Sequence, residues 1–258
     1  YPAMLEITPS FACLRLAASD SQDVQSANLS QPIDVPAGTE FSFNGPQQQV
    51  VQFLSTTPIK INPYQLSNIS VEKAPFDCDP PASAHKTSGL IHIELAMTEG
   101  FYGTDFGDFN FYVHSVQRGA EQIIDLLLTQ CLGITINDSQ GHRHCEVDPR
   151  QLQSRLCDHR FRIMPYAKGQ FSGLDMLRDF LAFPDKSRFF TIKGLGKKLC
   201  TVKDHKLTIN LYLRQWPSHL LHLFNVDLLA LNVIPVLNRF AASAEPVQYD
   251  FSHLEVPV

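Results

Sequence analysis

Histidine and cysteine side chains gather in one stretch of this sequence. The segment GHRHC places His142, His144 and Cys145 together, and the segment LCDH adds Cys157 and His159. Zinc is bound in proteins by these types of side chain, so the cluster is a candidate metal site. The spacing fits no common zinc pattern, however, and a predicted helix start separates the two segments. We therefore interpret the cluster as solvated loop histidines and a buried thiol, and we assign no metal to it.

Other segments carry residues of catalytic type without completing a known pattern. His219 and His222 lack the glutamate of the HExxH zinc-protease motif. In GQFSG (169–173) the serine stands one position too late for the GxSxG motif of hydrolases. GLGKK (194–198) matches neither the phosphate loop GxxxxGK[ST] nor GxGxxG. A catalytic domain of this size usually contains one coherent constellation, so we predict no catalytic residue and no cofactor, and we expect a role in assembly or binding.

The elements that would position such residues are clearest in Leu174–Leu195. Ser172 and Asp175 form a capping box ahead of a predicted amphipathic helix, which makes Ser172 a cap rather than a nucleophile. Pro184 ends this helix because it cannot donate a backbone hydrogen bond and restricts the residue before it. A short strand is predicted to follow at Arg188–Ile192. The apolar stripe of the helix consists of Leu174, Leu177, Phe180 and Leu181.

The rest of the chain is rich in short predicted strands. Leu90–Met97 and Leu207–Leu213 alternate apolar and polar residues, which predicts half-buried strands. An apolar stripe over Val116–Cys131 predicts a helix, with Ser115 before it and Gly133 as its stop. There is no βαβ alternation and no repeat. The predicted fold class is α+β and β-rich, with short, mostly antiparallel strands in sandwich-like sheets and three or four inserted helices.

The position of a proline-containing stretch without periodicity suggests that the chain has three parts. Residues 1–76 form a predicted N-terminal β-rich region. Residues 77–88 contain two prolines, small residues and no periodicity, so they are predicted to be a linker. Residues 89–258 form a predicted α+β region that contains the LAFPDKSRFF stretch. Within it, Asp148 followed by Pro149 predicts a further helix start.

Composition excludes several classes of function. The 21 Lys and Arg against 26 Asp and Glu leave a net charge of −5, and without a basic run we expect no nucleic-acid binding. No apolar run approaches the roughly 20 residues of a membrane span, and no signal peptide is seen. The six cysteines are scattered, which is typical of free thiols in a reducing cytosol. The chain starts at Tyr1 without methionine, and we expect an internal fragment of a longer protein.

Three segments, in collinear order, resemble one protein family. The stretch Leu177–Leu195 resembles the pattern Y-F-A-F-P-E-K-F-x-F-F. Residues 1–10 resemble Y-P-x-x-L-x-P-x-P-S, and residues 235–250 resemble P-x-x-N-x-F-x-x-x-A-E-P followed by an acidic position. These patterns are similar to those of the TssF family, also called ImpG or VasA. The matching positions that we take as structural motif residues are Phe180, Ala182, Phe183, Pro184, Phe189, Phe190, Pro235, Asn238, Phe240 and Pro246.

The resemblance implies a structural role without enzymatic activity. TssF proteins are baseplate wedge subunits of the bacterial type VI secretion system, a contractile injection system related to phage baseplates. The resemblance implies as partners TssG, a second TssF copy, TssK and other baseplate or sheath-linked proteins. It implies no nucleic-acid partner and no direct insertion into a membrane. It also implies assembly in the cytoplasm, on a baseplate docked at the inner membrane.

Two other functions are kept as alternatives. A β-rich carbohydrate- or small-ligand-binding module would present exposed aromatic rings as a platform. A hydrolase would need its scattered histidines and aspartates in one cleft with a nucleophile. The structural interpretation predicts instead that Phe180, Phe183, Phe189 and Phe190 lie mainly in the core, where truncation of a phenylalanine costs about 3–5 kcal/mol.

Overall fold

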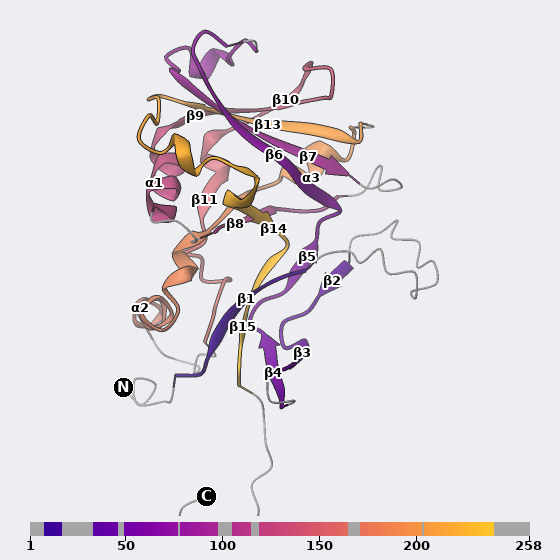
Figure 1. The fold of residues 1–258 in the computed structure, drawn as a ribbon, viewed down its shortest axis with the longest axis vertical. Helices are drawn as coiled ribbons and strands as arrows, with labels where there is room; N and C mark the ends of the chain where they lie inside the picture. The colour runs from indigo at the N-terminus through magenta and orange to yellow at the C-terminus, as the bar shows by residue number, and fades with distance from the viewer. Residues whose placement is uncertain are drawn as a thin grey trace, which may run out of the picture.

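The protein is an antiparallel β-rich structure with few helices. The computed structural model describes residues 8–16, 33–45, 49–76, 78–97, 105–114, 119–164, 171–202 and 204–239. These residues form 15 strands and three α-helices, and every strand pairing among them is antiparallel. Figure 1 shows a five-stranded sheet at one end of the longest axis and a four-stranded sheet towards the other end. The predicted α+β, β-rich fold class is confirmed.

The five-stranded sheet is made by sequences that alternate apolar and polar residues. In its strand β7, Ile91, Ile93 and Leu95 are buried, whereas His92 and Glu94 are half-buried on the opposite face. The half-buried strands predicted from alternation are therefore confirmed. In spatial order the strands are β10 (Arg143–Val147), β9 (Cys131–Asn137), β13 (Lys206–Leu213), β7 (Gly89–Met97) and β6 (Tyr64–Lys73).

A second sheet covers the inner face of the first. Its strands in spatial order are β11 (Leu152–Ser154), β12 (Phe189–Ile192), β8 (Phe109–Val113) and β14 (Leu229–Leu231). The largest apolar cluster draws buried residues from both sheets. At its centre the rings of Phe111 and Phe190 stack with centroids 5.0 Å apart. This layered arrangement explains the aromatic-rich composition of the chain.

Helix α1 (Ala120–Gln130) closes one flank of this core. It buries Ile123 and Leu127, as its predicted apolar stripe requires. The predicted cap Ser115 lies outside the described residues, and the helix begins after Gly119. The prediction that Gly133 stops the helix is wrong. The helix ends at Gln130, and the backbone is extended from Cys131, where strand β9 begins.

Gly133 has a different role, within strand β9. A Cβ atom on this residue would lie 2.8 Å from Cγ of Pro81 and 3.0 Å from Cβ of Ala84. The segment containing Pro81 and Ala84 therefore packs against β9 at a distance that only glycine permits. This segment lies within residues 77–88, which connect the neighbouring strands β6 and β7. The division into regions 1–76, 77–88 and 89–258 stays a prediction.

The other four-stranded sheet joins the first and last described strands. Strand β1 pairs with β15 along its whole length, from Phe11 opposite Leu237 to Arg15 opposite Val233. A separate two-stranded sheet lies beside it (Figure 1). The strands of the larger sheet are β1 (Phe11–Arg15), β15 (Val233–Leu237), β4 (Val50–Ser55) and β3 (Glu40–Asn44), and those of the smaller are β2 (Ile33–Val35) and β5 (Ile59–Ile61).

Short helical turns connect these elements. Asp148 caps one of them as predicted, since its side chain accepts a hydrogen bond from the Arg150 N–H at 2.9 Å. The element is a single 3₁₀ turn rather than a longer helix, because strand β11 begins at Leu152. The short elements are η2 (Ala82–Ala84), η3 (Pro149–Gln151), η4 (Pro184–Arg188), α3 (Leu195–Leu199), η5 (Leu221–Leu223) and η6 (Val226–Leu228).

Candidate functional site

The predicted histidine and cysteine cluster is distributed along exposed turns and strand edges. His142 is exposed, with Nδ1 3.5 Å from an Asp138 carboxylate oxygen. His144 uses Nε2 to contact the Thr201 hydroxyl at 3.0 Å. Cys157 and His159 are also exposed. Among the residues that the structure describes, no group of three or more His, Cys, Asp or Glu side chains is arranged to hold a metal ion.

Three of the cysteine thiols are partly buried, and this makes them unsuited to nucleophilic chemistry. All six are free. Burial raises the pKa of Cys13 and of Cys131 to about 12, and burial also raises the pKa of Cys145. Because the thiolate is the reactive form, these three groups are inert near neutral pH.

A cavity of about 410 Å³ lies at the N-terminal end of α1, beside Leu223. Its charged lining residues, Arg15 and Asp227, are exposed. No Phe, Tyr or Trp is found among the described residues that line it. The described lining of this cavity therefore lacks the aromatic platform expected of a carbohydrate-binding module.

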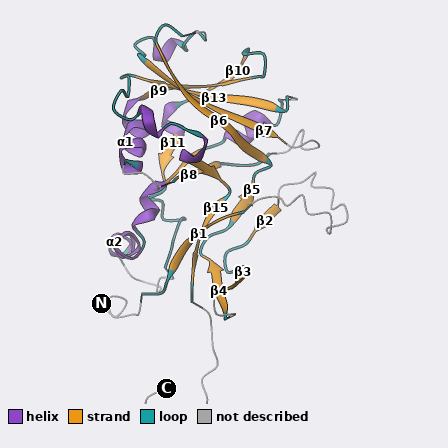
Figure 2. Ribbon diagram, viewed as in Figure 1, coloured by secondary structure: helices purple, strands orange, loops and turns teal. Residues whose placement is uncertain are grey.

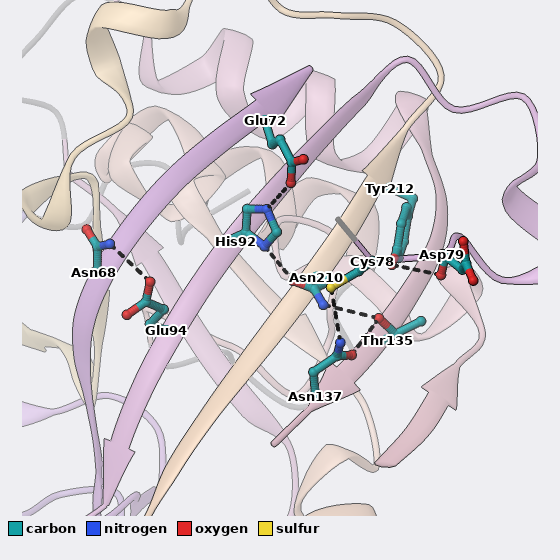
Figure 3. A network of polar contacts seen from close by, with 10 residues as sticks. All are labelled: Asn68, Glu72, Cys78, Asp79, His92, Glu94, Thr135, Asn137, Asn210 and Tyr212. Carbon is teal, nitrogen blue, oxygen red and sulfur yellow. Dashed lines mark hydrogen bonds and ion pairs between the residues drawn. The ribbon is translucent and has the colours of Figure 1, made fainter. Parts of the chain in front are cut away.

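A polar network crosses the outer face of the five-stranded sheet (Figure 3). His92 of β7 lies at its centre, with Nε2 2.9 Å from Oε2 of Glu72 on β6 and Nδ1 2.8 Å from Oδ1 of Asn210 on β13. Asn210 in turn donates to the Thr135 hydroxyl at 3.4 Å. Both nitrogens of the histidine are thus occupied by residues of neighbouring strands.

The same network continues into strand β9 and the loop that follows it. The Thr135 hydroxyl donates to Oδ1 of Asn137 at 3.1 Å, and the Asn137 amide donates to the Gly141 carbonyl at 2.9 Å and to Sγ of Cys78 at 3.6 Å. This hydroxyl therefore donates to an amide oxygen. In a catalytic triad the nucleophilic hydroxyl donates to a general base instead, so this arrangement does not activate Thr135. Thr135, Asn137 and Asn210 are all buried, so the network satisfies their polar groups and ties four strands together.

Helix α2 (Ser172–Ala182) has the reverse orientation to the one predicted. Leu177 and Leu181 are 48% and 64% exposed, whereas Asp175 and Asp179 are buried. The prediction that Phe180 lies in the core is wrong, since its side chain is 39% exposed. The N-cap position is held by Phe171 instead of Ser172, which is the first residue of the helix.

A buried ion pair sets this orientation. The Asp179 carboxylate lies 2.8 Å from Nζ of Lys186, and the two side chains are 0% and 1% exposed. The same carboxylate accepts backbone N–H bonds from Ile163 at 3.1 Å and from Met164 at 3.0 Å. A buried carboxylate is tolerated when it is paired and hydrogen-bonded in this way. The inward face of α2 is therefore its charged face.

Sequence reasoning missed this anchor, although a signal was present. Asp179 directly follows Arg178 and stands seven residues before Lys186, with Pro184 between them. The proline begins the turn η4 (Pro184–Arg188), in which the Lys186 N–H donates to the Phe183 carbonyl at 3.0 Å. This turn folds Lys186 back beneath the helix. An acidic residue followed by a proline turn and then by a lysine was the feature to notice.

The other aromatic motif residues point inward. Phe183 is 7% exposed and lies against Phe11, with ring centroids 5.4 Å apart. Phe189 packs between Tyr112 and Phe161, at 4.8 Å and 4.9 Å. Together with the stacked Phe190, these residues confirm three of the four predicted core phenylalanines. They hold the α2–η4–β12 unit against the body of the protein.

The remaining described motif positions lie at the end of α2, in η4, and in or just after β15. Ala182 is half-buried at the end of α2, and Pro184 is exposed at the first position of η4. Pro235 lies in β15, where its carbonyl accepts the Thr56 N–H at 3.2 Å. The Asn238 amide donates to the Gln52 carbonyl at 2.7 Å. Phe240 and Pro246 lie outside the described residues.

Arg188 connects the motif turn to helix α1. Its guanidinium contacts Asp185 at 2.6 Å and Glu121 at 3.0 Å. The pKa of Glu121 is lowered, chiefly by a backbone hydrogen bond at the start of α1 and then by Arg188. Because Glu121 is largely exposed, we regard this contact as orienting rather than strongly stabilising.

A family model described as "Type VI secretion system, TssF" matches residues 1–258, which is the whole chain. The chain belongs to the TssF family. The prediction made from the motif segments is therefore confirmed. No match was found among curated proteins.

A solved structure contains a chain with the same fold. The chain is similar to one in the cryo-electron microscopy structure of the type VI secretion system TssK-TssF-TssG baseplate subcomplex. The TM-score is 0.78 with 19% sequence identity, and the match covers 99% of this chain and 45% of the other. This chain thus spans less than half the length of that one. No helix within the described ranges is long and apolar enough to span a membrane.

Proposed function

We propose that this TssF-family chain is a structural component of a type VI secretion system baseplate. The observation that carries the proposal is the family match over residues 1–258. The similar fold in a TssK-TssF-TssG subcomplex supports TssG and TssK as partners. A second copy of the TssF protein and sheath-linked proteins complete the set of partners that we propose.

The arrangement of the described side chains supports a role without catalysis. The hydroxyl of Thr135 donates to Asn137, both ring nitrogens of His92 are bonded to other groups, and the partly buried thiols of Cys13 and Cys131 are protonated near neutral pH. The aromatic motif residues serve the core. We propose that the protein is not an enzyme, and that it works in the cytoplasm on a baseplate docked at the inner membrane.

The test is a co-expression experiment with the full-length protein. An affinity-tagged copy is expressed with the TssG and TssK subunits of its own system, and the co-purified proteins are identified by mass spectrometry. We expect TssG and TssK to be recovered with the tagged protein. Recovery of neither subunit would contradict the proposed function. An unrelated tagged protein of similar size serves as the control for non-specific capture.

A further inference from the structure

A chain of side-chain hydrogen bonds crosses the outer face of the five-stranded sheet from β6 to β9 (Figure 3). In order across the sheet, its members are Glu72, His92, Asn210, Thr135 and Asn137. The last three are 1%, 0% and 4% exposed, so water does not readily replace a missing link there. The choice of donor and acceptor at each link is therefore set by the neighbouring links.

The direction of the chain is set at its Asn137 end. The backbone carbonyl of Gly141 can only accept, so the Asn137 side chain must present its NH₂ group there, at 2.9 Å. The oxygen of the same amide then faces the Thr135 hydroxyl at 3.1 Å and accepts the single proton of that hydroxyl. Towards Asn210, the hydroxyl oxygen of Thr135 can therefore only accept.

This direction determines the protons on the ring of His92. Asn210 presents its NH₂ group to Thr135 at 3.4 Å, and its oxygen Oδ1 lies 2.8 Å from Nδ1 of His92. Because an amide oxygen only accepts, Nδ1 must carry a proton. On the other side of the ring, Nε2 lies 2.9 Å from Oε2 of Glu72, and a carboxylate also only accepts. Both ring nitrogens thus face acceptors, and only the doubly protonated imidazolium donates from both.

The charge of such a ring is balanced on the same face of the sheet. The side chains of His92 and Glu72 are 19% and 28% exposed, so water screens their ion pair only in part. A second carboxylate on this face, that of Glu94, accepts instead from the Asn68 amide at 3.1 Å. The other titratable residues of the network are Tyr212 from β13 and, from the connection between β6 and β7, Cys78 and Asp79.

We propose that His92 is held as an imidazolium in the folded protein, and that its second proton completes a proton-sensitive link across four strands. Loss of that proton leaves Nε2–H with the Glu72 carboxylate, while Nδ1 and Oδ1 of Asn210 face each other as two acceptors. Asn210 can then turn its amide only if Thr135 also turns its hydroxyl, which leaves the buried oxygen of Asn137 without its donor. A buried polar group without a partner is costly. The link is therefore complete while His92 is charged, and it opens as the pH rises.

The test is solid-state NMR of the full-length protein with ¹⁵N-labelled histidine, near neutral pH. The signals of His92 are assigned by their absence from the His92→Gln variant. We expect both ring nitrogens of His92 at the chemical shift of protonated nitrogen, whereas a neutral ring gives one protonated and one unprotonated signal. When the pH is raised, Nδ1 should lose its proton and Nε2 should keep its own. A neutral ring near neutral pH would overturn the proposal.

The variant Thr135→Val separates the effect of the chain from that of the ion pair. Valine is similar in size to threonine but forms no hydrogen bond with Asn210, whose amide is then free to present its NH₂ group to Nδ1 of His92. We expect the ring to lose its Nδ1 proton in this variant, although Glu72 is unchanged. Two protonated nitrogens in the folded variant would mean that Glu72 alone holds the charge, and the chain would have no part in it.

The variant Glu72→Gln keeps the proposal testable if Thr135→Val does not fold. The glutamine amide can donate to Nε2, so the ring of His92 needs only its Nδ1 proton and should be neutral. The matched control is Glu94→Gln, which changes the carboxylate bonded to Asn68 and should leave both His92 nitrogens protonated. A doubly protonated ring in Glu72→Gln, or a neutral ring in Glu94→Gln, would overturn the assigned role of Glu72.

Discussion

Helices α1 and α2 have equal length and opposite packing. Each has 11 residues and each is amphipathic in sequence, and both lie along one flank of the molecule (Figure 2). Helix α1 turns Ile123 and Leu127 into the core. Helix α2 turns Asp179 inward and leaves Leu177 and Leu181 exposed. An amphipathic pattern therefore predicts that a helix has an apolar face and a polar face, but it does not determine which of the two is buried.

The difference has a local cause. In α1 the apolar face decides the packing, as is usual for a helix at the surface of a protein. In α2 the carboxylate of Asp179 is bound in the interior by the ammonium group of Lys186 and by two backbone N–H groups. Full burial of a leucine gains about 1.5–3 kcal/mol, whereas leaving a buried charge without partners costs more. The following substitutions test this explanation.

The largest effect is expected from Asp179→Ala. The change leaves the buried ammonium group of Lys186 without its counter-charge, and removal of one member of a buried pair costs about 3–5 kcal/mol. Urea unfolding followed by circular dichroism measures the loss. The double variant Asp179→Ala/Lys186→Met removes both charges and should lose clearly less stability than the single variant. Equal losses would mean that the lysine charge is not what holds α2 in place.

The core-facing side of α1 should give the next largest effect. Leu127→Ala opens a cavity beneath the helix, because this side chain is 2% exposed, and the expected loss of stability is about 3 kcal/mol. The neighbouring Leu128 is 37% exposed, and Leu128→Ala should cost under about 1 kcal/mol. The same urea measurement compares the two. Similar losses at the two positions would contradict the assigned orientation of α1.

A pH-dependent effect of intermediate size is expected at Cys131, directly after α1. Burial raises the pKa of this thiol from 9.0 to about 12 in the folded protein. The folded state therefore keeps a proton that the unfolded state releases above pH 9, and stability falls as the pH rises from 9 towards 12. At a pH of about 10 the loss from this group is about 1.4 kcal/mol. The comparison is between the unmodified protein and Cys131→Ala, whose difference in stability should shrink by this amount between about pH 8 and about pH 10.

The smallest effect is expected on the exposed side of α2. Leu181→Ala removes a side chain that is 64% exposed, so the free energy of unfolding should change by less than about 0.5 kcal/mol. Thermal melting of the chain without partners measures this directly. A loss as large as that of Leu127→Ala would show that Leu181 packs against the protein itself, and it would contradict the assigned orientation of α2.

The parts of the fold that follow from local pattern were predictable from the sequence. Strand β7 follows from the strict alternation around His92, and the burial of Phe189 and Phe190 follows from their place in the short predicted strand Arg188–Ile192. The orientation of α2 was not predictable from its stripe of leucines. It depends on contacts between Asp179 and backbone groups of residues 163 and 164, which no periodicity within the helix encodes.

The pairing of β1 with β15 has a consequence for synthesis of the protein. Phe11 can pair with Leu237 only after almost all the described residues have been translated. Contacts between such distant positions close slowly, and during translation β1 cannot form this pairing until β15 has left the ribosome. Its apolar residues Ala12 and Leu14, which pack near Ile234 in the finished protein, must meanwhile avoid other unpaired strands. A nascent chain that stalls before β15 should therefore be prone to aggregation and to capture by chaperones.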